Sequence, residues 1–341
     1  MTTLLLSHPA SLEHLTPPGH PERPDRIRAV AQVLGESRFD GLVRYQAPEG
    51  SLDLVALCHS EQYVEELRHI APLSGLVYLD ELRRTQPGIK GVITATRGNH
   101  GQSIAYAAAR LGLAATIVVP HGNSVEKNRA MAAFGATLVE AGHDFQAAYE
   151  HAVAQAASDN LHLVRSFDPA LVRGVATCGL ELLRAVEGVD TVYVPIGLGS
   201  GICAMIAARA ALGMTAEIVG VVAANAPAYA LSVAAGAPVS TNSADTIADG
   251  LAVRVPDAAA LRVIRSGAAR ILTVSEAEIR GAMRILFTDT HNVAEGAGAA
   301  SLAAALKERE RLAGKRIAIV LSGGNIDRAL FAEVLAEADL E

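Results

Sequence analysis

Short apolar runs rich in β-branched residues alternate with helix-periodic stretches over most of this chain. The runs that predict strands are residues 92–96, 115–119, 136–139, 191–194, 217–222 and 317–321. Between them lie amphipathic stretches at residues 102–111, 124–134, 145–157 and 276–287. Apolar strands that alternate with helices indicate parallel sheets covered on both faces. The sequence therefore predicts an α/β fold.

The length and the charge of the chain limit its organisation and its partners. A length of 341 residues predicts about two domains, which we place at residues 75–157 (smaller) and 158–341 (larger). Residues 1–74 form a separate segment that holds five of the eleven histidines and a proline-rich run. A formal net charge of -7 argues against nucleic acid as a partner, because nucleic-acid-binding domains usually carry a basic surface.

No segment of the sequence predicts secretion or insertion into a membrane. The N-terminal stretch has a very short apolar run and no basic region, so it does not fit a signal peptide. The most apolar stretch, residues 191–214, contains a proline, four glycines and an arginine and fits a strand, a loop and a helix better than a membrane span. The three cysteines are widely spaced and form no disulfide or zinc pattern. We therefore expect a cytoplasmic protein.

The first segment that predicts chemistry follows the expected strand at residues 92–96 and opens a helix. It covers residues 94–102 and includes Thr96, Gly98, Asn99 and His100. Helix N-termini present unpaired N–H groups and a partial positive charge, so this turn can bind a carboxylate or a phosphate. A plain strand-to-helix turn with Asn99 as its cap explains the local pattern equally well.

A glycine-rich loop follows the expected strand at residues 191–194 and opens a second helix. It consists of Gly197, Leu198, Gly199, Ser200 and Gly201. Glycines let backbone N–H groups converge on phosphate oxygens, so the loop predicts a phosphate site that needs no lysine. A dinucleotide-binding loop is a weaker alternative, because Ile202 stands at its third glycine position and Glu217 precedes its strand. The Gly-Lys-Ser/Thr of a P-loop is absent.

Two further turns carry one polar side chain each. Ser322 lies in a Leu-Ser-Gly-Gly-Asn turn after the expected strand at residues 317–321, where its hydroxyl can meet a ring nitrogen. Glu295 lies among small residues that allow a flat ligand to approach. Each residue also fits a simpler role, Ser322 or Asn325 as a helix cap and Glu295 as an acid favoured by a helix dipole.

Together the four segments resemble, in their order and spacing, the fold-type II pyridoxal-phosphate enzymes, and within them the threonine dehydratases (threonine ammonia-lyases). The resemblance runs from about residue 75 to the C-terminus and includes residues 122–128 and 246–250. It implies two parallel-sheet domains, pyridoxal 5'-phosphate as cofactor, and β-elimination of threonine or serine to a 2-oxo acid and ammonia. It also implies a small-molecule hydroxy amino acid as substrate and association into a homo-oligomer.

The resemblance implies a role for each site residue. Asn99 is expected to meet the ring hydroxyl of the cofactor, Ser322 its pyridine nitrogen, and Glu295 to lie near the ring. The phosphate is expected at Gly197, Leu198, Gly199, Ser200 and Gly201. The substrate carboxylate is expected at Thr96, Gly98, Asn99 and His100. Arg97 stands where related racemases carry a serine as second base, which favours elimination. Residues 222–226 hold no carboxylate for the cation that some relatives bind, so no metal is expected.

The sequence departs from this family at the lysine on which the family's reaction depends. In the family the lysine lies in a Ser/Ala-Phe-Lys-x-Arg-Gly motif, just before the segment that matches residues 75–82. Here the corresponding residues, 70–74, read Ile-Ala-Pro-Leu-Ser. The four lysines of the chain are Lys90, Lys127, Lys307 and Lys315. We expect none of them to replace the missing lysine, so we assign no catalytic residue.

The N-terminal segment resembles a different family. Residues 8–9, His14, residues 18–26 and residues 58–64 are similar to the start of the histone-deacetylase-like and acetylpolyamine amidohydrolases, over about residues 4–70. The zinc ligands of that family lie further along its sequence and have no counterpart here, so we expect no deacetylase. The chain is therefore interpreted as a truncated fusion joined near residues 71–75. The two open alternatives are a lyase and a non-catalytic, cofactor-binding or non-functional product.

Overall fold

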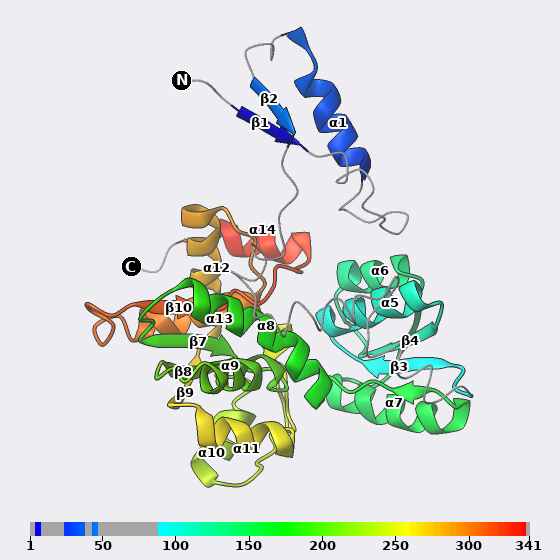
Figure 1. The fold of residues 1–341 in the computed structure, drawn as a ribbon. Helices are drawn as coiled ribbons and strands as arrows, with labels where there is room; N and C mark the ends of the chain where they lie inside the picture. The colour runs from blue at the N-terminus through cyan, green and yellow to red at the C-terminus, as the bar shows by residue number, and fades with distance from the viewer. Residues whose placement is uncertain (1–3, 8–23, 38–42, 47–87, 339–341) are drawn as a thin grey trace. The chain divides into compact units, whose positions relative to one another are not determined.

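The computed structural model describes residues 4–7, 24–37, 43–46 and 88–338 (Figure 1). The chain divides into two units, Met1–Val77 and Tyr78–Glu341. The first unit contains β1 (Leu4–Ser7), α1 (Pro24–Leu34) and β2 (Val43–Gln46). Its two strands are parallel, with Leu4 opposite Val43. The histidines of this unit and residues 58–64 lie outside the described residues, so the resemblance to deacetylases remains a prediction.

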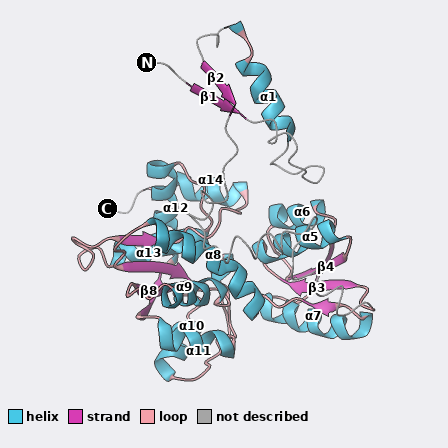
Figure 2. Ribbon diagram, viewed as in Figure 1, coloured by secondary structure: helices cyan, strands magenta, loops and turns pink. Residues whose placement is uncertain are grey.

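The larger sheet of the second unit has four parallel strands in the order β10-β7-β8-β9, which are labelled in Figure 1 and drawn in magenta in Figure 2. These strands are β7 (Thr191–Pro195), β8 (Glu217–Ala223), β9 (Arg270–Val274) and β10 (Ile317–Ile319). The helices are α8 (Pro169–Ala185), α9 (Ser200–Ala211), α10 (Ala228–Ala235), α11 (Ala258–Gly267), α12 (Glu276–Thr290), α13 (Gly296–Lys307) and α14 (Arg328–Ala336), with a 3-10 turn η3 (Asp249–Leu251).

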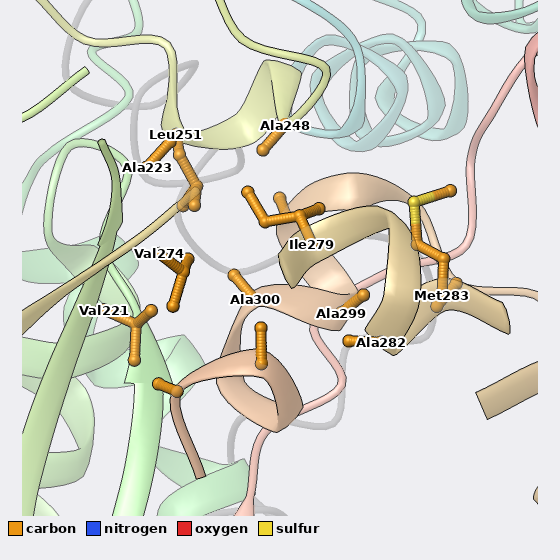
Figure 3. Packing of buried hydrophobic residues seen from close by; sticks show 14 of the residues in the cluster. Val221, Ala223, Ala248, Leu251, Val274, Ile279, Ala282, Met283, Ala299 and Ala300 are labelled. Atoms are coloured by element: carbon orange, nitrogen blue, oxygen red, sulfur yellow. The ribbon is translucent and has the colours of Figure 1, made fainter. Parts of the chain in front are cut away.

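Strand β8, one of the two inner strands, is apolar from residue 218 to residue 223, where both of its faces are covered. Val219 and Val221 pack into a core with α12 and α13, whereas Ile218 and Val222 pack into a second core with α9 and α11. Figure 3 shows the first core, where Val221 and the strand residue Val274 face the small residues of α13. A parallel strand buried on both faces is expected to be a continuous apolar run.

The smaller sheet also has four parallel strands, in the order β5-β4-β3-β6. These strands are β3 (Gly91–Ala95), β4 (Ala114–Val119), β5 (Thr137–Glu140) and β6 (His162–Leu163). The helices are α5 (Asn99–Leu111), α6 (Val125–Ala133) and α7 (Phe145–Asp159). Ile93 packs with α7, whereas Val92 packs with α5, so the helices cover both faces of this sheet as well.

The α/β fold predicted from the alternation of strands and helices is confirmed, and so are the two parallel-sheet domains that the resemblance implies. The six predicted strands and the four predicted helices are all present, although their ends shift by up to three residues. The sequence did not reveal β6, which has only two residues and pairs with β3, or β9, which is only half-buried along most of its length. Within the described residues, no helix has both the length and the apolar character needed to cross a membrane.

Candidate functional site

A cavity of about 260 Å³ lies between the two sheets, at the carboxyl ends of β3 and β7. Ligand loops gather at such strand ends in open α/β sheets. The predicted site residues that line the cavity are Thr96, Gly98, Asn99, His100, Gly197, Leu198, Gly199, Ser200, Glu295 and Ser322. Gly201 does not line it and lies in the first turn of α9. The structure therefore brings together residues that are up to 226 positions apart in the sequence (322 − 96 = 226).

The glycine-rich loop forms a cradle at the start of α9. The N-cap residue Gly199 has a φ of 100°, in the left-handed region that glycine adopts without a steric penalty. The N–H groups of the first turn of a helix have no acceptor within the helix, and here no side chain caps them. A Cβ on Gly197 would overlap the carbonyl oxygen of Gly250, so the loop lies directly on the η3 turn. The N–H groups at this helix start suit an anion such as phosphate.

A second helix N-terminus, that of α5, faces the same cavity. The buried Thr96 hydroxyl accepts hydrogen bonds from the backbone N–H groups of Gly98 (2.9 Å) and Gly101 (3.2 Å). It therefore holds the turn in shape. The N–H groups of Asn99 and His100 belong to the first helical turn, which lacks intrahelical acceptors. They are the donors that this turn offers to a carboxylate.

The His100 ring turns toward the small sheet. Its Nε2 lies 3.0 Å from Oγ1 of Thr94, whose hydroxyl donates to the carbonyl oxygen of Val164 at 2.7 Å. Burial disfavours the charged imidazolium and lowers the pKa of His100 from 6.5 to about 4, although a hydrogen bond with the Val164 backbone opposes the shift. The ring is therefore neutral near pH 7 and keeps the α5 turn in place.

Asn99 and Glu295 are joined across the cavity. Nδ2 of Asn99 donates to Oε1 of Glu295 at 2.7 Å. Nδ2 of Asn325 donates to Oδ1 of Asn99 at 2.7 Å, which fixes the orientation of the Asn99 amide. Glu295 is only 4% exposed, so its charge needs partners nearby. A Cβ on Gly323 would overlap Oε1 of Glu295, so this glycine leaves room for the carboxylate.

Lys127 also enters this site, which the sequence analysis did not anticipate. Its Nζ lies 3.0 Å from Oε2 of Glu295 and 3.2 Å from Oδ2 of Asp249, and the residue is 5% exposed. The sequence analysis expected none of the four lysines to replace the missing one, and it did not foresee that Lys127 would line the cavity. In the sequence, Lys127 is only the third residue of a helix that follows a strand and a cap at Ser124, and nothing there indicates where its side chain points.

Arg97 completes the charged wall of the cavity. Its guanidinium contacts Oδ1 of Asp249 at 2.7 Å. Its Nε is buried and lacks a hydrogen-bond partner, whereas buried donors normally have one. A free donor, an anion cradle at α9, an amide at Asn99 and a hydroxyl at Ser322 suit a phosphorylated, polar aromatic ring. The residues present therefore fit pyridoxal phosphate.

Comparison with known proteins agrees with this donor set. The family model described as "Pyridoxal-phosphate dependent enzyme" matches residues 69–323. The chain belongs to this family, and the cofactor of the family is pyridoxal phosphate.

Several individual relatives of known name are similar to this chain. The chain is 34% identical to the L-threonine ammonia-lyase of Thermotoga maritima over 239 residues, which cover 70% of this chain and 59% of that protein. It is also 34% identical to a catabolic L-threonine dehydratase of Staphylococcus aureus, over 70% of each protein. The processed form of threonine deaminase isoform 2 from Solanum lycopersicum superposes with a TM-score of 0.68 at 30% identity, over 73% of this chain and 74% of that one. The chain spans only about 60% of the length of the first two curated relatives.

Proposed function

We propose that the chain is a pyridoxal-phosphate-dependent ammonia-lyase that converts threonine or serine to a 2-oxo acid and ammonia. One observation carries the proposal: a single cavity contains the uncapped α9 cradle, Ser322, Asn99 and the N-terminus of α5. A phosphate, a pyridine ring and an amino-acid carboxylate each find a suitable donor there. The names of the relatives support the threonine reaction.

In this proposal, each group of residues that lines the cavity binds a different part of the cofactor or the substrate. Bound there, pyridoxal phosphate supplies an electron sink for the carbon from which the α-proton is removed. The N–H groups at the start of α9 hold a phosphate, and the Ser322 hydroxyl hydrogen-bonds a pyridine nitrogen. The Asn99 amide donates to a ring hydroxyl, and the first turn of α5 holds the substrate carboxylate.

Arg97 supports elimination over racemisation. A racemase needs a second base on the opposite side of the substrate, and a guanidinium is not deprotonated in proteins. Arg97 is paired with Asp249, so it serves as a fixed positive charge beside the substrate site. We therefore expect loss of the hydroxyl group and no inversion at the α-carbon.

A non-catalytic cofactor-binding protein is the second candidate. It is favoured by the absence of lysine from residues 70–74, where the family motif carries it. The cradle and the ring contacts do not depend on that lysine, so the cofactor can bind without turnover. The two candidates differ only in whether product forms.

The test measures turnover and cofactor binding on the same purified full chain. With L-threonine and pyridoxal phosphate we expect 2-oxobutanoate and ammonia in equal amounts, with pyruvate from L-serine and no change in the optical purity of unreacted substrate. Ser322→Ala should lower the rate at least tenfold, whereas Ser158→Ala, an exposed serine on α7, should leave it unchanged. A rate equal to that of free pyridoxal phosphate, with the cofactor bound, would establish the second candidate.

A further inference from the structure

Lys127 is the one lysine that reaches the candidate cofactor site. All four lysines of the chain lie in the described part, and only Lys127 lines the cavity. Lys90 and Lys315 are exposed. Nζ of Lys307 contacts the Thr273 carbonyl oxygen and Glu278 at the surface. Among the described residues, the chain therefore offers a single lysine amine to a ligand bound between the sheets.

The path of the Lys127 side chain depends on Gly98. A Cβ on Gly98 would overlap Cδ of Lys127, and it would lie 3.2 Å from Cγ and 3.3 Å from Cε. The aliphatic part of Lys127 therefore runs over the backbone at the start of α5, where any side chain would obstruct it. This route takes the amine from α6 into the cavity, away from water.

The amine is held beside the position expected for the reactive end of the cofactor. Glu295 accepts from Lys127 Nζ with Oε2 (3.0 Å) and from Asn99 Nδ2 with Oε1 (2.7 Å). The lysine amine and the Asn99 amide are thus neighbours on the two oxygens of one carboxylate. The Asn99 amide is proposed to meet the ring hydroxyl of pyridoxal phosphate, and in that molecule the aldehyde carbon is attached next to the hydroxyl. The hydroxyl stands between the aldehyde and the methyl group, and we take the amine to lie on the aldehyde side.

We propose that Lys127 binds pyridoxal phosphate covalently and takes the place of the lysine that residues 70–74 lack. This inference rests on the cofactor site of the proposed function. Glu295 accepts a proton from the ammonium group, and the neutral amine attacks the aldehyde carbon. The C=O bond is replaced by a C=N bond, the aldehyde oxygen leaves as one water molecule, and Glu295 returns its proton to the imine nitrogen. No oxidant or reductant is required.

The test traps the bond chemically on the full chain. The protein is incubated with pyridoxal phosphate, reduced with borohydride, digested and mapped by mass spectrometry. We expect a phosphopyridoxyl group on Lys127 in most chains and at least tenfold less on each other amine. Modification spread over Lys90, Lys307, Lys315 or the N-terminus, with Lys127 unmodified, would overturn the proposal.

Matched variants separate this bond from simple cofactor binding. Lys127→Arg should abolish the imine absorption band while bound phosphate-ester cofactor is still detected by equilibrium dialysis. Lys90→Arg and Lys307→Arg, both outside the cavity, should keep the band. Gly98→Ala should reduce labelling of Lys127 several-fold without changing the circular dichroism spectrum. A full band in Lys127→Arg would refute the proposal even if the other variants behave as expected.

The outcomes also separate this inference from the lyase proposal. Labelled Lys127 without threonine turnover would support the covalent bond and contradict the lyase. Threonine turnover with unlabelled Lys127 would support the lyase and overturn the covalent bond. The mapping on the unmodified chain requires no variant, so misfolding of Lys127→Arg leaves the test intact.

Discussion

The two sheets of the second unit contribute unequally to stability and to the site. Among the described residues, the large sheet packs against two cores of 20 and 19 buried residues. The small sheet has three clusters, of six, five and three buried residues. The large sheet supplies the α9 cradle and Ser322, whereas the small sheet supplies Asn99 and Lys127. A stable platform is thus paired with a thinner domain that carries the reactive groups.

Polar contacts hold the small sheet to the large one around the cavity. Asp249 of the large-sheet region pairs with Arg97 and Lys127 of the small-sheet region. Arg254 pairs with Asp144 at a second point. Ion pairs are weakened by salt and by loss of either partner. The geometry of the site should therefore depend on charge more than the fold of either sheet does.

The largest expected effect is a difference in how much a core substitution lowers the free energy of unfolding in the two sheets. Ile218 on β8 and Ile117 on β4 are both fully buried, but Ile218 belongs to the 19-residue core and Ile117 to the three-residue cluster. Ile218→Ala should destabilise by about 4 kcal/mol and Ile117→Ala by about 2 kcal/mol, because a small cluster relaxes more readily around a cavity. Urea unfolding followed by circular dichroism measures both. Equal losses of unfolding free energy for the two variants would contradict the proposed difference in packing.

The next effect concerns the charges between the sheets. Asp249→Asn leaves Arg97 and Lys127 without a shared carboxylate, and Asp249 is 23% exposed, so we expect a loss of about 2 kcal/mol. The matched control is Glu217→Gln, which removes a more exposed partner of Arg270 within the large-sheet domain and should cost below about 1 kcal/mol. Thermal unfolding at low salt compares them. A cost for Asp249→Asn no greater than that of the control would argue against ionic docking.

Two helix caps provide a smaller and closely matched comparison. Ser275 caps α12 within the large-sheet domain, in a capping box with Glu278. Ser124 caps α6 and also donates to Oδ1 of Asp327 in the large-sheet region at 2.5 Å. Ser275→Ala should cost about 1 kcal/mol and Ser124→Ala about 2 kcal/mol, because only the second also breaks a contact between the sheets. If chemical denaturation gives the reverse order, the Ser124 contact does not join the sheets.

The smallest expected effect is a pH dependence confined to the small sheet. The lowered pKa of His100 means that the unfolded chain binds a proton more readily, so stability falls as pH drops through 6.5 toward about 4. Burial also lowers the pKa of His162 on β6. Hydrogen bonds from Arg270 hold the pKa values of Glu217 and Glu308 in the large-sheet region below their usual 4.5, so these carboxylates stay charged between pH 7 and 6.

Hydrogen exchange between pH 7 and 6, corrected for intrinsic rates, measures this effect by region. Peptides of β3 and α5 should lose a little protection, whereas peptides of β7 and β8 should not. His100→Gln should reduce this loss of protection by the share that comes from protonation of His100. Equal loss of protection in both sheets would contradict the assignment.

The sequence predicted those parts of the fold that depend on residues close together along the chain. The apolar run of β8, buried on both faces, and the glycine-rich start of α9 are both visible as patterns along the chain. The family resemblance that these patterns support allowed most of the predicted site residues to be placed at the cavity in advance, although Gly201 does not line it and Lys127 was missed.

Side-chain direction was not predictable in the same way. Lys127 meets Asp249 across 122 positions of sequence and reaches it only because Gly98 has no side chain. The turn of the His100 ring toward Thr94 likewise depends on how α5 packs on its sheet. Such contacts arise from tertiary packing, which leaves no periodic pattern in the sequence.

A crystal structure of the full chain grown with pyridoxal phosphate tests the central claim most directly. We predict the phosphate at the start of α9, the ring between Asn99 and Ser322, and continuous electron density from Nζ of Lys127 to the former aldehyde carbon. Lys127 still paired with Glu295 and Asp249, with the cofactor absent from the cavity or bound without a link to the lysine, would contradict it.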